Sequence, residues 1–384
     1  MRGTTAVVGI GQTPLYKRGT SPDPEMKLCL RAIVDACADA GISPRDVDGF
    51  VSYGSERNEG QKLMPALGTR ELRFAALIWG HGGGIPGALG LGASAIVTGQ
   101  AEVVAVYRSL AEGSGARLRV AVAQDDTAAQ YLVNGMDGPV QICAMRSQRM
   151  IEADGVPRST LFAMARASYH HARRNPGAAG ARSDFDAEVY QRSRFVSEPY
   201  HLFDCSRESD AGVAVILVSA GRARDLTDRP AYLLSAPTGA AAGWGPLEEN
   251  HSPYSSSGFQ PVARRLWAES GYGPADVDVA QIYENATGMG VGAIIDHGFC
   301  TAEEAGGFIT FENLIAPDGR LPVNTAGGNL AEGFVHGMSL VTEGVRQIRG
   351  TSTNQVPGAR LSLVTGGPGD TIVSSALLGG SETV

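Results

Sequence analysis

Hydrophobic and polar positions along the chain follow a helix period in some segments and form unbroken apolar runs in others. An amphipathic segment at 26–40 ends at a glycine, passes through a Pro-Asp turn and leads into an apolar run at 49–53. The same order of features occurs again at 262–270 and 279–283. A helix with a glycine C-cap, followed by a buried strand, is the unit of alternating α/β folds.

The two units are copies of each other in sequence. AGISPRDVDGFVSYG at 40–54 matches SGYGPADVDVAQIYE at 270–284, displaced by 230 residues. Identical pairs are Gly41/Gly271, Pro44/Pro274, Asp46/Asp276, Val47/Val277, Asp48/Asp278 and Tyr53/Tyr283. A long duplicated α/β chain predicts a layered α-β-α-β-α domain with its cleft at the carboxyl ends of the strands. The alternative is a chance match between two common helix–Gly–Pro–strand units.

The segments between the copies predict the rest of the organisation. A strand, a glycine turn, a helix of small residues and a strand at 103–107 follow the first copy, and the small residues suit a buried central helix. Helices expected at about 139–152 and 158–175 interrupt this rhythm and predict a helical loop domain, or lid, inserted at about 110–200. We therefore expect an N-terminal half at 1–230 and a C-terminal half at 231–384, with the last strand at 361–367.

Composition and charge exclude several classes of protein. The 384 residues are 43% hydrophobic and 19% charged, as is usual for a folded globular protein. A net charge of −8, with no basic cluster carrying interleaved aromatics, argues against nucleic acid or an anionic membrane surface as the main partner. With no basic-then-apolar leader and no run of about 18 apolar residues, we expect a soluble cytoplasmic protein without membrane insertion.

The first glycine turn is a candidate binding site for an anion. His81 precedes Gly82, Gly83 and Gly84 at a strand-to-helix turn. Backbone N–H groups and the helix dipole at such a turn can hold a developing negative charge. The equally weighted alternative is that the glycines only allow a tight turn and close packing of the helix.

The second half contains a corresponding turn and two further candidates. Gly327 and Gly328 precede Phe334 and His336 at a predicted helix start, where a histidine can act as an acid or base or simply cap the helix. Tyr283 ends the repeated strand, so its phenol is expected at the carboxyl edge of the sheet. A buried tyrosine with its hydroxyl capped by the backbone is the alternative.

Several kinds of chemistry lack support in the sequence. Five scattered cysteines without a C-x-x-C, and single histidines apart from the surface pair expected at His170 and His171, argue against a zinc or other metal site. The lysines are Lys17, Lys27 and Lys62, none in a glycine turn, as a Schiff-base enzyme would need. Neither a P-loop nor a dinucleotide fingerprint occurs, so we expect no cofactor.

Four motifs together resemble the thiolase superfamily over essentially the full length. They are AIVTGQAEVVAVYRS, SYHHARRNPGA, LFDCSRESDAGVAVILVSAGRARDL and NTAGGNLAEGFVHG. The resemblance implies the duplicated five-layer α-β-α-β-α fold and places the thiolase nucleophilic cysteine at Gly82. The second catalytic cysteine falls in LSLVTGGPGD, which has none, and the histidine of the Gly-His-Pro motif falls at Phe334. An acyl-cysteine intermediate is therefore not expected.

This pattern is similar to the lipid-transfer-protein branch of the superfamily, above all the steroid side-chain-cleaving aldolases. These have HxGGG, a strand-end Leu-Tyr-Asp and GG-x5-Tyr-x-His-Gly; Tyr283 matches their first site tyrosine, and Phe334 stands where the second is expected. The resemblance implies that Tyr283, His336 and His81 share the proton transfers, or that the chemistry differs here. The expected oxyanion and substrate-binding residues are Gly82, Gly83, Gly84, Gly327, Gly328 and Phe334.

The implied reaction is retro-aldol cleavage of a β-hydroxyacyl-CoA through a thioester enolate, with coenzyme A entering only as part of the substrate. The resemblance also implies a homodimer core and a small OB-fold, zinc-ribbon companion subunit, forming a heterotetramer. Two alternatives remain open: a cysteine-free acyl-CoA condensing enzyme, and a non-catalytic acyl-CoA or sterol-binding protein, which Phe334 favours.

Overall fold

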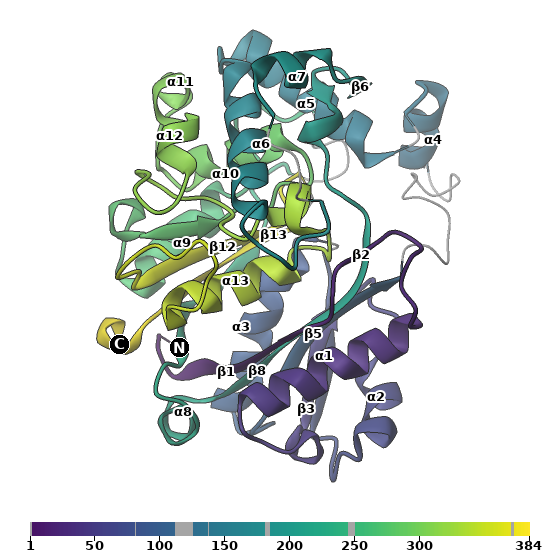
Figure 1. Ribbon diagram of the computed structural model, residues 1–384, viewed down its shortest axis with the longest axis vertical. Helices are drawn as coiled ribbons and strands as arrows, with labels where there is room; N and C mark the ends of the chain where they lie inside the picture. The colour runs from purple at the N-terminus through teal and green to yellow at the C-terminus, as the bar shows by residue number, and fades with distance from the viewer. Residues whose placement is uncertain are drawn as a thin grey trace.

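The computed structural model describes residues 2–80, 82–111, 126–136, 138–180, 185–244, 250–369 and 372–384. The first half of the fold alternates strands and helices and ends in one long strand and a short helix (Figure 1). Its main elements are β1 (Thr5–Gln12), α1 (Glu25–Asp39), β3 (Gly49–Tyr53), α2 (Gly60–Leu67), β4 (Phe74–Ile78), α3 (Gly84–Val97), β5 (Val104–Ala111), β8 (Ser209–Ser219) and α8 (Ala220–Leu226).

The second half repeats this plan with shorter strands. Its elements are β9 (Ala231–Ser235), α9 (Gln260–Ser270), β11 (Val279–Gln281), α10 (Thr287–Asp296), α11 (Ala305–Phe308), α12 (Phe311–Leu314), the π-helical turn η6 (Gly328–Glu332), α13 (Met338–Arg349), β12 (Leu361–Gly366) and β13 (Val373–Gly379). Two-residue strands β2 (Tyr16–Lys17) and β10 (Thr238–Gly239) pair with β8 and β13.

The order of strands within the described residues displays the duplication directly. It runs β4-β3-β5-β8-β1 in one half and β11-β12-β13-β9 in the other, and β1 and β9 pair antiparallel where the halves meet. β3 lies parallel to β5 as β11 lies parallel to β12, while β8 and β13 run antiparallel to β5 and β12. Apart from the additional edge strand β4, the two halves therefore have the same strand order and directions.

Helices cover both half-sheets and also separate them. α1 packs on β1, β5 and β8, and α9 packs on β9 and β13, which makes them outer layers. α3 contacts both β3 and β13, and α13 contacts both β8 and β12, so these two helices form the middle layer. The five-layer α-β-α-β-α prediction is confirmed, and the Gly- and Ala-rich α3 is the buried central helix.

Asp48 and Asp278, which match in the sequence repeat, have the same structural role. The carboxylate of Asp48 accepts the N–H groups of Glu102 and Val103 before β5, at 3.0 and 2.8 Å. The carboxylate of Asp278 accepts those of Arg360 and Leu361 before β12, at 2.8 and 2.9 Å. Each aspartate thus ties the entry of one strand to the start of the next, which explains why the sequence match includes it.

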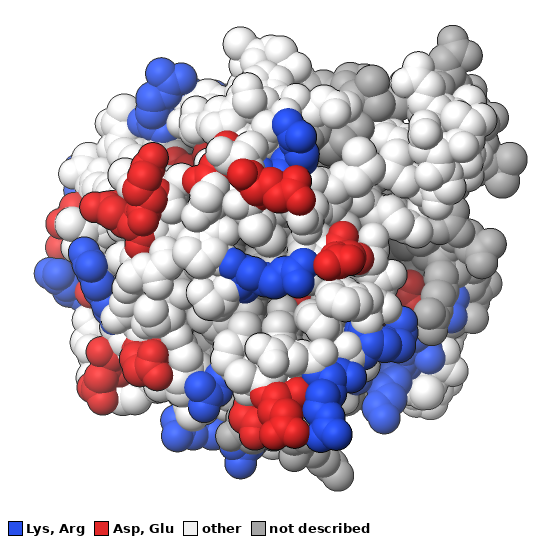
Figure 2. Space-filling model, turned by 90° about the horizontal axis from the view of Figure 1, so that it is seen from above, with Lys and Arg blue, Asp and Glu red and all other residues white. Residues whose placement is uncertain are grey.

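The insertion lies at one end of the molecule, at the top of Figure 1. Its elements are α4 (Asp126–Val133), α5 (Pro139–Ala153), α6 (Ser159–Ala172), α7 (Ala187–Arg192), β6 (Phe195–Ser197) and β7 (Tyr200–His201). α6 packs on α10 and η6, which attaches the insertion to the second half. Seen from above, acidic and basic side chains are interspersed between wide uncharged areas (Figure 2).

Three expectations about local structure were wrong. The last strand is β13, not the run expected at 361–367. Its polar Ser374 and Ser375 interrupt the apolar pattern in the sequence, although both are fully buried. β11 ends at Gln281, so Tyr283 lies just beyond the strand. His171 is fully buried rather than on the surface, and its Nε2 accepts the N–H of Ala316 at 2.9 Å.

No helix in the described ranges is long and apolar enough to cross a membrane.

Candidate active site

Four aromatic rings form a row between the two halves. Tyr53 comes from the end of β3, Tyr283 from just after β11, and Phe334 and His336 from the segment between η6 and α13. The centroid of the His336 ring is 5.3 Å from that of Tyr53 and 4.7 Å from that of Phe334, and Phe334 is 6.1 Å from Tyr283. All three pairs are edge-to-face, a favourable geometry for aromatic contacts. The two tyrosines paired by the sequence repeat therefore stand at opposite ends of one row.

The hydroxyl of Tyr283 lies directly against Gly82. A β-carbon at Gly82 would overlap that hydroxyl, and one at Gly337 would lie 2.6 Å from Cδ2 of the same ring. Tyr283 is 3% exposed, and its N–H donates to Oγ1 of Thr365 at 2.9 Å. The ring thus fills the space that any side chain at position 82 would need.

The other glycines of this turn also serve close packing. Gly83 is the N-cap of α3, and a β-carbon there would overlap the carbonyl of Ile372. At Gly84 a β-carbon would lie 2.6 Å from Cβ of Tyr53. The packing role is therefore real, and it also brings the start of α3 within contact of both tyrosines. An oxyanion role for these N–H groups stays a prediction, and His81 lies outside the described residues.

One ring nitrogen of His336, Nδ1, meets two neighbouring side chains. Its Nδ1 contacts the hydroxyl of Tyr53 and lies 3.2 Å from both Nε and Nη2 of Arg108. The backbone φ of His336 is 48°, in the left-handed region that non-glycine residues rarely adopt. Such a conformation persists only where the surroundings hold it, and it is common at functional sites.

Behind His336 stands a buried ion pair. Nη1 of Arg108 donates to Oε2 of Glu56 at 2.9 Å, and the two side chains are 3% and 0% exposed. Glu56 also accepts the N–H and hydroxyl of Ser109, at 2.8 and 3.0 Å, and the N–H of Asn58 at 2.9 Å. Burial disfavours the charged guanidinium, but Coulombic attraction to Tyr53 and Glu56 outweighs it and raises the pKa of Arg108. The Arg108 guanidinium therefore stays charged, and its bond to Glu56 fixes it in place.

Sequence reasoning missed Tyr53, Arg108 and Glu56 as site residues. A signal for Tyr53 was available, because it is the repeat partner of Tyr283, and duplicated halves can bring both copies to a shared centre. Arg108 and Glu56 carried no such signal, since a strand arginine and a loop glutamate are ordinary surface residues in most chains. Only the tertiary structure places them together.

Gly327 and Gly328 lie to one side of the aromatic row. Both have positive φ, 113° and 58°, and a β-carbon at Gly328 would overlap Oε1 of Glu284, while one at Gly327 would lie 2.6 Å from Cβ of Ala172. Glu284 is fully buried, and burial raises its pKa to about 8. These glycines therefore contact the neighbour of Tyr283 and the loop domain, and their substrate-binding role stays a prediction.

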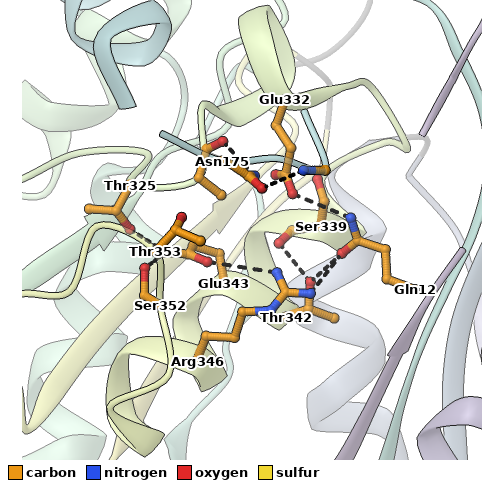
Figure 3. A network of polar contacts seen from close by, with 12 residues as sticks. Gln12, Asn175, Thr325, Glu332, Ser339, Thr342, Glu343, Arg346, Ser352 and Thr353 are labelled. Carbon is orange, nitrogen blue, oxygen red and sulfur yellow. Dashed lines mark hydrogen bonds and ion pairs between the residues drawn. The ribbon is translucent and has the colours of Figure 1, made fainter. Parts of the chain in front are cut away.

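A polar network lies beneath η6 (Figure 3). Nε2 of Gln12 donates to Oε1 of Glu332 at 3.3 Å, and Oε1 of Gln12 accepts from Thr342 and Arg346 at 3.1 and 3.2 Å. Asn175, which follows α6, also reaches Glu332 (Figure 3). Burial raises the pKa of Glu332 to about 8. The network joins β1, α13, η6 and the loop domain behind the candidate site.

The donor sets in the described residues offer no obvious metal centre. No three His, Cys, Asp or Glu side chains gather there as ligands. No disulfide joins the five cysteines, which are Cys29, Cys37, Cys143, Cys205 and Cys300. Whether the protein uses a cofactor is not tested by this arrangement, so its absence stays a prediction.

Known proteins resemble this chain in sequence and in fold. The model of the thiolase C-terminal domain-like family matches residues 245–378. A 17-hydroxy-3-oxo-4-pregnene-20-carboxyl-CoA lyase from Mycobacterium tuberculosis is 37% identical, covering 96% of this chain and 97% of its own. A steroid side-chain-cleaving aldolase from Thermomonospora curvata is 36% identical, covering 99% and 98%.

The solved structures agree with the sequence relatives. A structure described as an Ltp2-ChsH2(DUF35) aldolase superimposes with a TM-score of 0.92 at 35% identity, covering 99% of this chain and 98% of the other. Human mitochondrial 3-ketoacyl-CoA thiolase superimposes with a TM-score of 0.71 at 13% identity, which shows a shared fold.

Proposed function

Because the chain belongs to the thiolase-like steroid side-chain-cleaving aldolases, we propose that it cleaves a carbon–carbon bond of a β-hydroxyacyl-CoA by retro-aldol chemistry. The acyl group is proposed to be a steroid-type side chain with a hydroxyl β to the thioester. The products are a ketone and a shortened acyl-CoA, formed through a thioester enolate.

The observation that carries this proposal is the contact between Tyr283 and Gly82. A thiolase keeps its nucleophilic cysteine at the position of Gly82, and here a phenol hydroxyl fills the space of that side chain. A phenol can move a proton, and the cysteine thiol that would carry the acyl group is absent from this position. The site therefore suits bond cleavage without a covalent intermediate.

We assign stabilisation of the enolate charge and transfer of protons to different parts of the site. The turn at Gly82, Gly83 and Gly84 opens α3, where N–H groups and the helix dipole favour the negative charge of an enolate oxygen. One such donor contributes about 3–4 kcal/mol to the transition state. Tyr283 and His336 exchange protons with the substrate, and Phe334 lines the space between them.

The proposed assembly is a homodimer with a small companion subunit of the OB-fold and zinc-ribbon type, together a heterotetramer. The description of the Ltp2-ChsH2(DUF35) aldolase names two components, which supports a companion. Exposed apolar side chains on the loop domain, such as Val133, Val189 and Phe195, offer area for a partner. A cytoplasmic location is proposed as well, in keeping with the free cysteines.

Turnover of defined substrates tests the proposal. The protein, alone and together with any subunit that co-purifies, is incubated with a panel of β-hydroxyacyl-CoAs that carry tertiary alcohols, and CoA products are identified by mass spectrometry. A shortened acyl-CoA and a ketone in equal amounts are expected. Tyr283→Phe is expected to lower kcat at least about 100-fold while substrate binding is retained.

Tyr190→Phe is the matched control, because Tyr190 is 5% exposed and donates its hydroxyl to Asp204 at 2.7 Å in the loop domain. It is expected to change stability but not kcat. Binding of the same CoA esters without turnover, with the companion present, would instead support a non-catalytic carrier. A substrate-derived thioester trapped on the chain would overturn the cysteine-free route.

A further inference from the structure

The contacts of His336 determine where its proton sits. Arg108 points two N–H groups at Nδ1 of His336, both at 3.2 Å. A guanidinium has donors only and stays charged, so Nδ1 must act as an acceptor. A neutral imidazole that accepts at Nδ1 carries its proton on Nε2. The ring is thus an Nε2–H donor rather than a free base.

The same nitrogen also contacts the Tyr53 hydroxyl. Because Nδ1 is the acceptor, the Tyr53 hydroxyl donates to it. Cζ of Arg108 lies 4.6 Å from the centroid of the Tyr53 ring, so a negative charge appearing on the Tyr53 oxygen would be close to a fixed positive charge. Glu56 keeps Arg108 in place at 2.9 Å.

We propose that Tyr53, Arg108 and Glu56 form a positioning relay that fixes His336 as an Nε2–H donor and replaces the hydroxyl missing at Phe334. This inference rests on the proposed retro-aldol function and deepens it. Tyr53 is the duplicated counterpart of Tyr283, so the two copies of one sequence position supply the two ends of the site.

The relay moves protons only, so the O–H and N–H bonds that break in it are formed again within one turnover. The O–H bond of Tyr53 breaks as Nδ1 of His336 gains that proton, and the Nε2–H bond breaks as the enolate carbon gains the other. Tyr53 is left as a phenolate beside Arg108. The substrate hydroxyl gives up one proton for the one that the enolate carbon gains. That proton goes to Nε2 of His336 while Nδ1 returns its proton to the Tyr53 oxygen, so no further reactant is needed.

The tautomer is measured directly, without turnover, by nitrogen NMR of histidine-labelled full-length protein. The signal of His336 is assigned by its loss in His336→Gln. We expect a pyridine-type Nδ1 and a protonated Nε2 near neutral pH in the parent and in Tyr53→Phe. A protonated Nδ1 in the parent would overturn the proposal even if the protein is an active aldolase.

Kinetics test the relay itself. Tyr53→Phe keeps the ion pair and is expected to lower kcat about 100-fold with KM little changed, whereas Tyr190→Phe retains kcat. A kcat for Tyr53→Phe equal to that of Tyr190→Phe would contradict the relay. If the parent has no turnover on any substrate, the proposed function fails, while the NMR experiment still decides the tautomer.

Removing Arg108 alone would leave the Glu56 carboxylate buried and unpaired, which can prevent folding. The double variant Arg108→Met/Glu56→Gln removes both charges together. Its His336 ring is expected to populate the Nδ1–H tautomer, because the Tyr53 oxygen can then accept. An unchanged tautomer in a folded double variant would show that Arg108 does not set it, contrary to the proposal.

Discussion

At the scale of single residues, the site depends on a missing side chain. Gly82 leaves room for the hydroxyl of Tyr283, and Gly337 leaves room for the ring. The glycine at the proposed position of a thiolase cysteine therefore does more than omit a nucleophile. It also leaves the space for the Tyr283 phenol, the proposed proton-transfer group.

Gly82→Ala tests this dependence. The added methyl group would overlap the Tyr283 hydroxyl, so the ring or the turn must move. We expect kcat to fall at least about 100-fold, because displacement by about 1 Å is enough for such a loss. Steady-state kinetics on the cleaved CoA ester provides the measurement.

Gly221→Ala is the matched control. Gly221 lies in α8 with open space around its Cα, so the change is expected to leave kcat unaltered and to stabilise the protein by about 0.5–1 kcal/mol. Full activity in Gly82→Ala would mean that Tyr283 does not need its observed position.

At the scale of elements, η6 joins the site to the loop domain through buried polar groups. Glu332 is 1% exposed at the end of η6, where it meets Gln12 of β1 and Asn175 after α6. Its raised pKa, about 8 against 4.5 for an ordinary glutamate, means that the folded protein holds a proton that the unfolded chain releases. Stability from this group is thus full below about pH 4.5 and is lost as pH rises toward 8.

Glu332→Gln is expected to remove this loss of folding stability at high pH. The amide resembles the protonated acid in shape, so the variant should be as stable as the parent near pH 5 and more stable near pH 8. The difference grows by up to about 1.4 kcal/mol per pH unit in that window. Urea unfolding midpoints across the window provide the measurement, and parallel pH profiles for parent and variant would contradict the assignment.

At the scale of the whole molecule, the described sheet has an open edge at β4. β4 pairs with β3 alone among the described strands, and its Leu77 and the following Trp79 are 40% and 72% exposed. An exposed apolar edge strand is a template for pairing with another chain. This edge supports the proposed homodimer, with β4 of two copies side by side.

Leu77→Lys is expected to weaken the dimer, because a charge on an edge strand opposes pairing. Val34→Lys, on the outer face of α1 and 42% exposed, is the matched surface control and is expected to leave the assembly unchanged. Sedimentation of both variants at several concentrations measures the effect. A monomeric parent would contradict the homodimer. A Leu77→Lys variant that stays dimeric would place the interface away from β4.

The domain limits proposed from the sequence, a half at 1–230 with a loop domain at about 110–200 and a half at 231–384, remain a proposal. The chain crosses from the first half-sheet to the second in the segment from Leu226 to Ala231, which is compatible with these limits.

The sequence by itself determined the α/β class, the duplication and the buried central helix. These follow from periodicity, glycine caps and a repeated segment, which are local properties that survive in any fold of the chain. It missed β13, because the buried serines there satisfy their hydroxyls with distant groups: Ser374 with the carbonyl of Gly83 and Ser375 with the ring of His297.

Only the tertiary structure decided which side chains meet. Tyr53 and His336 are 283 positions apart, and Arg108 and His336 are 228 apart. Their contact exists because α3 and α13 pack the two half-sheets face to face. No local pattern records such a juxtaposition, since it depends on the packing of every layer in between.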